Sequence, residues 1–186
     1  MATQKVEKIF HNLIANSLLQ ISGLFMTLLL IAPLLLIQNV YAFEGYVTNE
    51  RSGDLIEIDS KANTVGVYPI CNRPRGMVKA IPATDLLIAC SDDNSVIRFD
   101  TKTKKIKSVI SDIPGAMNLS VDGARERLIV TNEGFAKATI IDLETGTPIA
   151  ELATGLEPDG AALFDKGRIL FIASENAGLV LSLIHI

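Results

Sequence analysis

The feature that most constrains this fold is a sequence pattern that returns at a nearly fixed interval. The segments YVTNERSGDLIEID, LIACSDDNSVIRFD and IVTNEGFAKATIID each end on an aspartate, at Asp59, Asp100 and Asp142. These aspartates lie 41 and then 42 residues apart. A repeat of this length indicates that one small structural unit is used several times and that neighbouring units stack on one another.

Each unit has the pattern of short strands separated by turns. Apolar and β-branched runs alternate with clusters of Gly, Pro, Asn and Asp, which is typical of strands joined by tight turns. We expect a loop over residues 72–76, because Pro74 and Gly76 interrupt a strand ladder. The predicted strands are residues 46–48, 55–58, 64–70, 77–81, 86–90, 95–99, 106–110, 117–121, 128–131, 138–141, 149–152, 161–164 and 169–173.

Several of these strands, such as residues 86–90 and 169–173, are continuous apolar runs, which suits burial on both faces. Four-stranded units of about 40 residues whose faces cover one another define a β-propeller. A two-sheet sandwich does not repeat at a fixed period, and a helical solenoid needs a 3.6-residue period that is absent here. We therefore predict an all-β fold, a β-propeller of four-stranded blades.

The repeats amount to about three and a half blades, and a ring closes with roughly 4–8. The first unit opens on what the later units use as their second strand. The fourth unit should reach an aspartate near position 184, where Ile184 stands, and the ending LSLIHI resembles a translated sequencing adapter. We expect a partial propeller over residues 43–181, an incomplete ring, and a non-native tail over residues 182–186.

A family resemblance supports the propeller prediction. The segment Tyr46–Asn49 matches the signature after which the YVTN-type β-propeller repeat family is named, and residues 129–132 differ from it at one position. The family also has a Pro-x-Gly step before the innermost strand, which residues 74–76 and 158–160 match. The resemblance covers residues 46–181 and implies an exported, usually seven-bladed propeller.

The family pattern continues with a Pro-Asp-Gly-like hairpin after the innermost strand, which residues 121–123 and 164–167 resemble. The second unit departs from the signature, since Cys90 stands in place of the asparagine. That position is therefore not an obligate ligand.

The first 42 residues are predicted to be a helical signal peptide. Lys5 and Lys8 precede an apolar run over residues 24–37, and the small-residue site Val40-Tyr41-Ala42 follows, which favours cleavage after Ala42. The run is shorter than the ~20 residues of a membrane span. An uncleaved anchor is the alternative, because the polar leader is long, and only that alternative would attach the protein to a membrane. Either way, we expect a periplasmic or extracellular protein.

Composition argues against several functions. The chain has 17 Lys and Arg against 21 Asp and Glu, a net charge of −4, so there is no strong signal for nucleic-acid binding. Both histidines, His11 and His185, lie outside residues 43–181, so that region cannot form a Ser-His-Asp or Cys-His pair. No haem motif and no phosphate-binding loop is present. We predict no cofactor, no catalytic residue and no metal ligand.

The two cysteines, Cys71 and Cys90, leave two possibilities open. A disulfide is allowed in an exported protein. Cys90, however, lies in an apolar strand, where a free cysteine behaves as a small buried hydrophobe. The sequence favours two free thiols.

The polar residues of the repeats allow a structural and a functional interpretation. Asp59, Asp100 and Asp142 each begin a turn, and aspartate commonly accepts hydrogen bonds from its own turn backbone, so we expect a structural role. Asn49 and Asn132 end matching strands, and a turn or packing role is favoured for them too.

Ligand binding is expected on the loops, where rigid folds carry their binding residues. Arg73 and Arg75 flank Pro74 beside the predicted channel and are the best candidates for an anionic ligand, although the sequence favours the alternative that they are solvated surface residues. The other candidates are Asn49, Glu50, Arg51, Asn132 and Glu133.

We expect a non-catalytic exported scaffold that binds an unknown protein or small molecule at its loop face near the central channel. The first alternative is a metal-dependent lactonase-like hydrolase, for which the innermost strands offer only Asn118, with Glu157 and Asp159 on a neighbouring loop. The second is a redox-associated propeller subunit. A fold of this kind does not by itself fix a function.

Overall fold

The computed structural model describes residues 45–80 and 84–184. They belong to one compact unit, which spans Glu44–Ile186. The signal peptide predicted over residues 1–42 lies outside the described residues. Within the described ranges, no helix has the length and apolar character to cross a bilayer.

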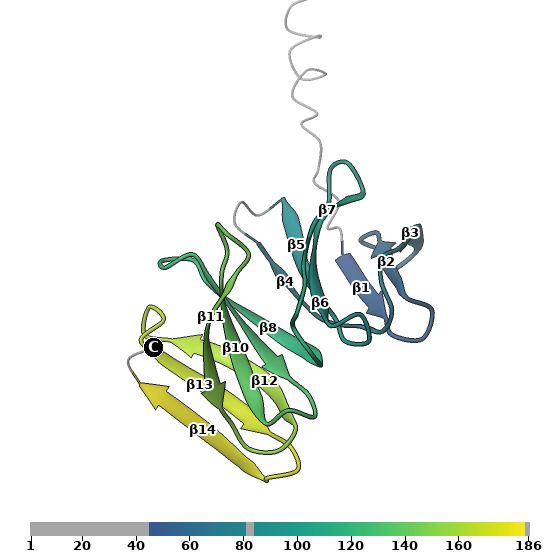
Figure 1. The fold of residues 1–186 in the computed structure, drawn as a ribbon. Coiled ribbons are helices and arrows are strands. Elements are labelled where there is room, and N and C mark those ends of the chain that lie inside the picture. The colour runs from purple at the N-terminus through teal and green to yellow at the C-terminus, as the bar shows by residue number, and fades with distance from the viewer. Residues whose placement is uncertain (1–44, 81–83, 185–186) are drawn as a thin grey trace, which may run out of the picture. The chain divides into compact units, whose positions relative to one another are not determined.

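All of the described secondary structure is β-strand, in four antiparallel sheets (Figure 1). Sheet 1 contains β1 (Gly45–Asn49), β2 (Asp54–Ile58) and β3 (Thr64–Pro69). Sheet 2 contains β4 (Pro74–Lys79), β5 (Asp85–Cys90), β6 (Ser95–Asp100) and β7 (Lys105–Ile110). Sheet 3 contains β8 (Ala116–Asp122), β9 (Arg127–Asn132), β10 (Lys137–Asp142) and β11 (Pro148–Ala153). Sheet 4 contains β12 (Pro158–Phe164), β13 (Ile169–Ser174) and β14 (Leu179–Ile184).

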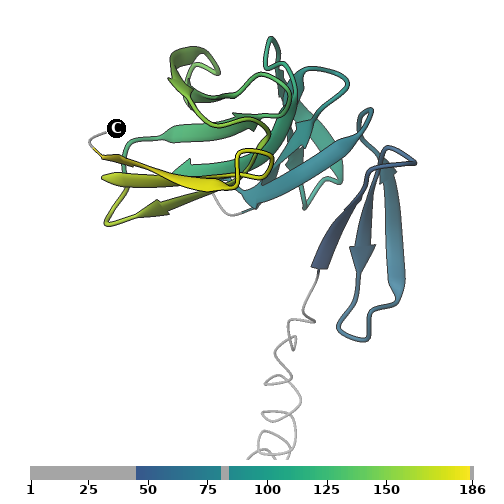
Figure 2. The ribbon, with the colours of Figure 1, turned by 90° about the horizontal axis from the view of Figure 1, so that it is seen from below.

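Consecutive sheets are joined through their first strands. Strand β8 packs against β4 and β5 of the preceding sheet, and β12 packs in the same way against β8 and β9. Strand β1 contacts β4, although by its sequence it matches the second strands β5 and β9. The sheets follow one another in chain order (Figures 1 and 2). This arrangement is a partial β-propeller with the sheets as its blades, as the repeats predicted.

The core consists of three apolar clusters, one between each pair of neighbouring sheets. Strand β5 serves two of them, because Leu86 and Ile88 face sheet 1 while Leu87 and Ala89 face sheet 3. Every residue of β5 is buried, which confirms the prediction for residues 86–90. Burial of this kind is a large source of stability, about 25 cal/mol for each Å² of apolar surface removed from water.

The same prediction was wrong for residues 169–173. Leu170 and Ile172 are buried against sheet 3, but Phe171 and Ala173 on the other face of β13 are exposed. Sheet 4 is the last of the described sheets, so no further described sheet covers that face. A run of apolar residues alone cannot distinguish an internal blade from a terminal one.

The expected loop over residues 72–76 was also wrong in part. Pro74 opens β4 and pairs with Cys90, and the register shifts between Pro74 and Met77. Strand β12 repeats this geometry from Pro158. Proline is tolerated here because the first residue of a strand with a bulge has no ladder N–H to donate. The Pro-x-Gly step is therefore the start of the innermost strands β4 and β12.

Glycine is required at the third position of the Pro-x-Gly step in sheet 2, which is Gly76. A Cβ atom on Gly76 would lie 2.7 Å from the carbonyl oxygen of Met117 and 2.9 Å from Cα of Asn118. The backbones of β4 and β8 thus approach one another more closely than any side chain allows. This contact sets the spacing of the two innermost strands.

Strand β14 was not predicted. It pairs along its length with β13, from Leu179 opposite Ser174 to Ile184 opposite Ile169. The structure therefore places part of the segment 182–186, predicted to be a non-native tail, within a strand.

Candidate functional site

The threonine of the repeated signature joins sheet 1 to sheet 2 and sheet 3 to sheet 4. The hydroxyl of Thr48 donates a hydrogen bond to the carbonyl oxygen of Arg75 (2.9 Å), and that of Thr131 donates to the carbonyl oxygen of Asp159 (3.1 Å). Arg75 and Asp159 are the middle residues of the two Pro-x-Gly steps. The two most distinctive motifs of the sequence are thus partners, and together they hold the loops at one end of the sheets in place.

The asparagines of the signature have structural roles. The Asn49 side-chain oxygen accepts hydrogen bonds from the backbone N–H groups of Arg51 (3.3 Å) and Ser52 (3.5 Å). Asn132 is fully buried, donates to the carbonyl oxygen of Pro114 (2.8 Å) and accepts from the Thr139 hydroxyl (2.8 Å). Their side chains therefore shape the loops rather than face a ligand.

The three repeated aspartates confirm the turn interpretation. Asp59 accepts from the backbone N–H of Lys61, Asp100 from that of Lys102, and Asp142 from that of Thr145, each at 2.8 Å. Hydrogen bonds of this kind, led by the backbone N–H of Thr103, hold the pKa of Asp100 below its usual value. Each of these carboxylates thus stabilises the turn that it begins.

Arg73 and Arg75 lie in a charged network with Glu50, Asp92 and Glu133, here called the Glu50 network. Glu50 bridges the two arginines, with Arg73 Nε at 2.9 Å from one carboxylate oxygen and Arg75 Nη1 at 2.7 Å from the other. Arg73 also approaches Glu133 (3.5 Å) and Asp92 (3.7 Å). The hydrogen bond from Arg73 lowers the pKa of Glu50, and the same bond raises the pKa of Arg73.

The structure thus brings together four of the seven predicted ligand-binding residues, namely Glu50, Arg73, Arg75 and Glu133. Glu50 and Glu133 lie on loops of sheets 1 and 3, Arg73 precedes β4 of sheet 2, and Arg75 lies within β4. Arg51 is exposed and makes no ion pair with the described residues. The sequence analysis missed Asp92, although it follows β5 by two residues much as Glu50 and Glu133 follow their own strands.

A disulfide anchors this site, which corrects the expectation of two free thiols. Cys71 and Cys90 are bonded, with their Cα atoms 5.9 Å apart. Cys90 is fully buried at the end of β5, as its apolar strand predicted, but the packing of sheet 1 on sheet 2 brings Cys71 to it. The bond ties the segment that begins with Asn72 and Arg73 to the central strand of sheet 2.

A surface hollow of ≈ 510 Å³ lies beside the Glu50 network. We call it the Gly115 hollow; its lining residues are Arg73, Ser91, Asp92, Asn94, Gly115, Glu133, Gly134, Phe135 and Glu157. Gly115 has a φ of +61°, and a Cβ atom there would lie 2.3 Å from the carbonyl oxygen of Glu133. Arg73 and Glu157 have the same left-handed conformation before their own innermost strands, but each carries a side chain. The missing side chain at Gly115 leaves the hollow open.

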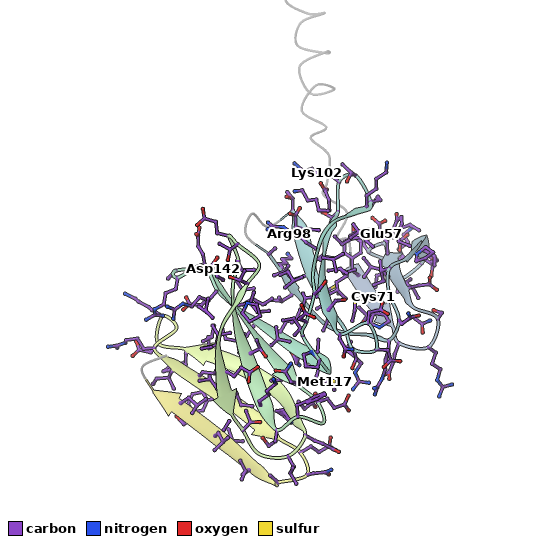
Figure 3. The ribbon with its side chains drawn as sticks, in the orientation of Figure 1. Glu57, Cys71, Arg98, Lys102, Met117 and Asp142 are labelled. Carbon is purple, nitrogen blue, oxygen red and sulfur yellow. A yellow bond between two sulfur atoms is a disulfide. The ribbon has the colours of Figure 1, made fainter. Side chains whose placement is uncertain are left out.

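A second charged cluster joins sheets 1 and 2 away from this hollow. Lys104 donates to Glu57 (2.5 Å) and to the Tyr46 hydroxyl (2.7 Å), and the Tyr68 hydroxyl donates to Glu57 (2.6 Å). Burial alone would raise the pKa of Glu57, but the hydrogen bonds from Lys104 and Tyr68 lower it. Figure 3 shows Glu57 and Cys71 on the side of sheet 1. The polar groups of this second cluster form hydrogen bonds with one another, which indicates a structural link between sheets 1 and 2.

Among the described residues, no group of three or more His, Cys, Asp or Glu side chains is placed to hold a metal ion. Asn118, considered for the hydrolase alternative, accepts a hydrogen bond from the backbone N–H of Leu119 (2.7 Å). Asp159 lies within β12 rather than on a loop.

Comparison with known proteins shows the fold and no family. No family model matches the chain, and no curated protein matches it. Among solved structures it is similar to hydrazine synthase from Kuenenia stuttgartiensis, with a TM-score of 0.67 and 14% identity over 75% of this chain and 42% of that chain. It is also similar to a chain of a mitotic checkpoint complex, with a TM-score of 0.64 and 11% identity over 77% of this chain and 45% of that chain.

A third similar structure is a protein of unknown function from Desulfotomaculum acetoxidans, with a TM-score of 0.59 and 11% identity over 76% of this chain and 51% of that chain. The chain spans about half or less of the length of all three structures. At these identities the similarity extends to the β-propeller fold alone.

Proposed function

We propose that this protein is an exported β-propeller of the YVTN type that serves as a binding scaffold. Its partner, a protein or a small molecule, is engaged at the loop face near the innermost strands. The Glu50 network and Arg51 form the contact surface, and Asn49 and Asn132 hold the loops that carry it. The domain boundaries are a signal peptide over residues 1–42 and the partial propeller from residue 43.

The observation that carries this proposal is the position of Arg73. It lies on a segment fixed by the Cys71–Cys90 disulfide and reaches carboxylates on the loops of three sheets, at Glu50, Asp92 and Glu133. Side chains held in this way present a fixed pattern of charge, and a pre-organised surface loses little entropy when a partner binds. Packing does not require charged residues from three blades to meet at one end.

Two further observations support the family and the export. The hydrogen bonds from Thr48 and Thr131 to the Pro-x-Gly carbonyls give the signature a structural reason, because the two motifs hold successive blades together. Disulfides persist mainly in oxidising compartments. The Cys71–Cys90 disulfide, together with the predicted signal peptide, therefore fits a periplasmic or extracellular protein.

A photo-cross-linking experiment in the native cell envelope tests the proposal. The benzophenone amino acid p-benzoylphenylalanine replaces Arg51 on the loop face or, as the control, the exposed Lys105 on strand β7. We expect a discrete adduct from position 51 and none from position 105. Equal adducts from both positions, or no adduct from either, would contradict a binding surface at the loop face.

A further inference from the structure

We propose that the Gly115 hollow binds an organic cation with N–H donors, an alkylammonium or guanidinium group such as that of lysine or arginine. The inference rests on the proposed scaffold function and specifies the chemistry of its ligand. Four features of the hollow carry it: its charge, a hydroxyl without a hydrogen bond on the mostly buried residue Ser91, an exposed aromatic ring and the open space over Gly115.

The charge of the hollow is negative. Its lining holds three carboxylates, Asp92, Glu133 and Glu157, against the single cation Arg73, a net charge of −2. The closest ion pair of Arg73 is with Glu50, which lies outside the hollow; its Nε is 2.9 Å from a Glu50 carboxylate oxygen. Its distances of 3.7 Å to Asp92 and 3.5 Å to Glu133 exceed those of good hydrogen bonds. Each carboxylate therefore keeps acceptor sites for a ligand.

Glu157 strengthens the case, because its carboxylate makes no ion pair or hydrogen bond with the described residues, although it lines the hollow. An anionic ligand, which the sequence suggested for Arg73 and Arg75, would meet three carboxylates and would have to displace Glu50. A cation would meet complementary charge without breaking any contact seen in the structure.

Ser91 supplies a polar group without a partner. The residue is only 6% exposed, it lines the hollow, and its hydroxyl makes no hydrogen bond with the described residues. An N–H group of a ligand seated in the hollow would donate to this oxygen, which a metal ion or a fully substituted ammonium could not do.

Phe135 completes the site at its rim. The ring is on a residue that is 54% exposed, and it lies 3.2 Å from the point where a Cβ atom of Gly115 would stand. An aromatic face attracts ammonium and guanidinium groups, and the ring also covers the apolar stem of a Lys or Arg side chain. Because Gly115 has no side chain, the space beside the ring stays open.

The test is calorimetric titration of the full chain, with its disulfide intact, at low ionic strength. N-acetyl-arginine amide is the probe, and N-acetyl-citrulline amide, which has nearly the same shape but no charge, is its matched control. We expect the arginine probe to bind at least tenfold more tightly than the citrulline probe and to weaken as salt screens the charges. Equal binding of both probes, or binding of neither, would overturn the proposal.

Two variants locate the binding. We expect Glu157→Gln to lower the affinity for the arginine probe at least tenfold. Glu144→Gln, the same change on an exposed turn outside the hollow, should leave this affinity unchanged. Circular dichroism confirms that both variants are folded. If Glu157→Gln and Phe135→Ala both bind the probe as the wild type does, the cation binds elsewhere and the assignment of the hollow is wrong.

A second set of probes identifies the source of the cation. An Arg-containing peptide that binds more tightly than the capped amino acid indicates a protein partner, whereas 1,4-diaminobutane binding as tightly as the peptide indicates a small amine. The two proposals fail separately. If no cation binds but position 51 still gives its cross-link, the cation site is wrong and the scaffold function stands. If cations bind and the cross-link is absent, a partner at the wider loop face is wrong.

Discussion

The hydroxyl of Thr131 accepts a hydrogen bond from the backbone N–H of Asn118 (3.0 Å) and donates one to the carbonyl oxygen of Asp159 (3.1 Å). One side chain of β9 thus links the innermost strands of two successive blades. The same hydroxyl position in sheet 1, Thr48, makes the equivalent contact with Arg75. The conserved geometry of this contact within one chain explains why threonine returns in the signature.

Replacing Thr131 by valine tests this link, because valine keeps the shape and removes the hydroxyl. The change removes the partner of two backbone groups, the N–H of half-buried Asn118 and the carbonyl of exposed Asp159, and we expect a loss of about 0.5–1.5 kcal/mol in the free energy of unfolding. Urea denaturation measures it. The control, Thr64→Val, alters an exposed threonine whose hydroxyl has no hydrogen bond among the described residues, and an equal loss there would contradict the account.

Gly76 and Gly160 occupy the same place in the two Pro-x-Gly steps but have different surroundings. A Cβ atom on Gly76 would lie 2.7 Å from the Met117 carbonyl oxygen, whereas on Gly160 the nearest atom, Cβ of Ala173, would be 3.8 Å away. We expect Gly76→Ala to cost about 1–3 kcal/mol by overpacking, and Gly160→Ala to be neutral or slightly stabilising. Thermal denaturation of the two variants compares them directly. Equal melting temperatures would show that β4 and β8 are not in close contact.

The disulfide predicts a chemical result and a stability result. The denatured, unreduced protein should contain no free thiol by Ellman titration, since Cys71 and Cys90 are bonded to each other. We expect the double variant Cys71→Ala/Cys90→Ala to lose about 3 kcal/mol, because the closed loop of 19 residues restricts the unfolded chain. Two titratable thiols in the untreated protein would contradict the structure.

Glu57 makes stability depend on pH in a defined direction. Its pKa in the folded chain lies below the ordinary value of 4.5. Its ionised form therefore stabilises the fold above the unfolded pKa, and this contribution is lost as the pH falls through the folded pKa. We expect Glu57→Gln to cost roughly 2–3 kcal/mol at pH 7, near the low end for a buried pair because Lys104 is 29% exposed.

Denaturation of the wild type and Glu57→Gln at pH 7 and pH 3 measures this effect, and the difference between them should shrink at the lower pH. Glu151→Gln serves as the control, since Glu151 pairs with Lys137 on the surface, where such a pair contributes under about 1 kcal/mol. A difference between wild type and Glu57→Gln that stays constant between the two pH values would exclude a role for the ionised carboxylate.

The fold could be predicted from the sequence because equivalent residues of successive repeats make equivalent contacts. The 41- and 42-residue spacing placed equivalent strands in neighbouring blades, and the apolar run of residues 86–90 is buried on both faces as expected. The beginnings of the innermost strands were missed, because a bulge after Pro74 or Pro158 tolerates residues that normally end a strand. Strand β14 was missed because residues 182–186 were interpreted as a tail.

The candidate site was predictable only in part. Glu50, Arg73, Arg75 and Glu133 were found because loop ends of successive repeats fall at one end of the blades. The Cys71–Cys90 bond and the contact of Glu57 with Lys104, which are 19 and 47 residues apart, depend on how one sheet packs on the next. No local pattern encodes such distances. The Gly115 hollow was missed for the same reason, since it results from an absent side chain between loops of three units.

The central claim is that each internal blade is buried on both faces by its neighbours, and amide hydrogen exchange of the full chain tests it most directly. We expect the slowest exchange in the central strands β5 and β9, and much faster exchange in β3 and β14, which lie at the edges of sheets 1 and 4. Exchange in β5 and β9 as fast as in β3 and β14 would contradict the stacked blades and the binding surface built on them.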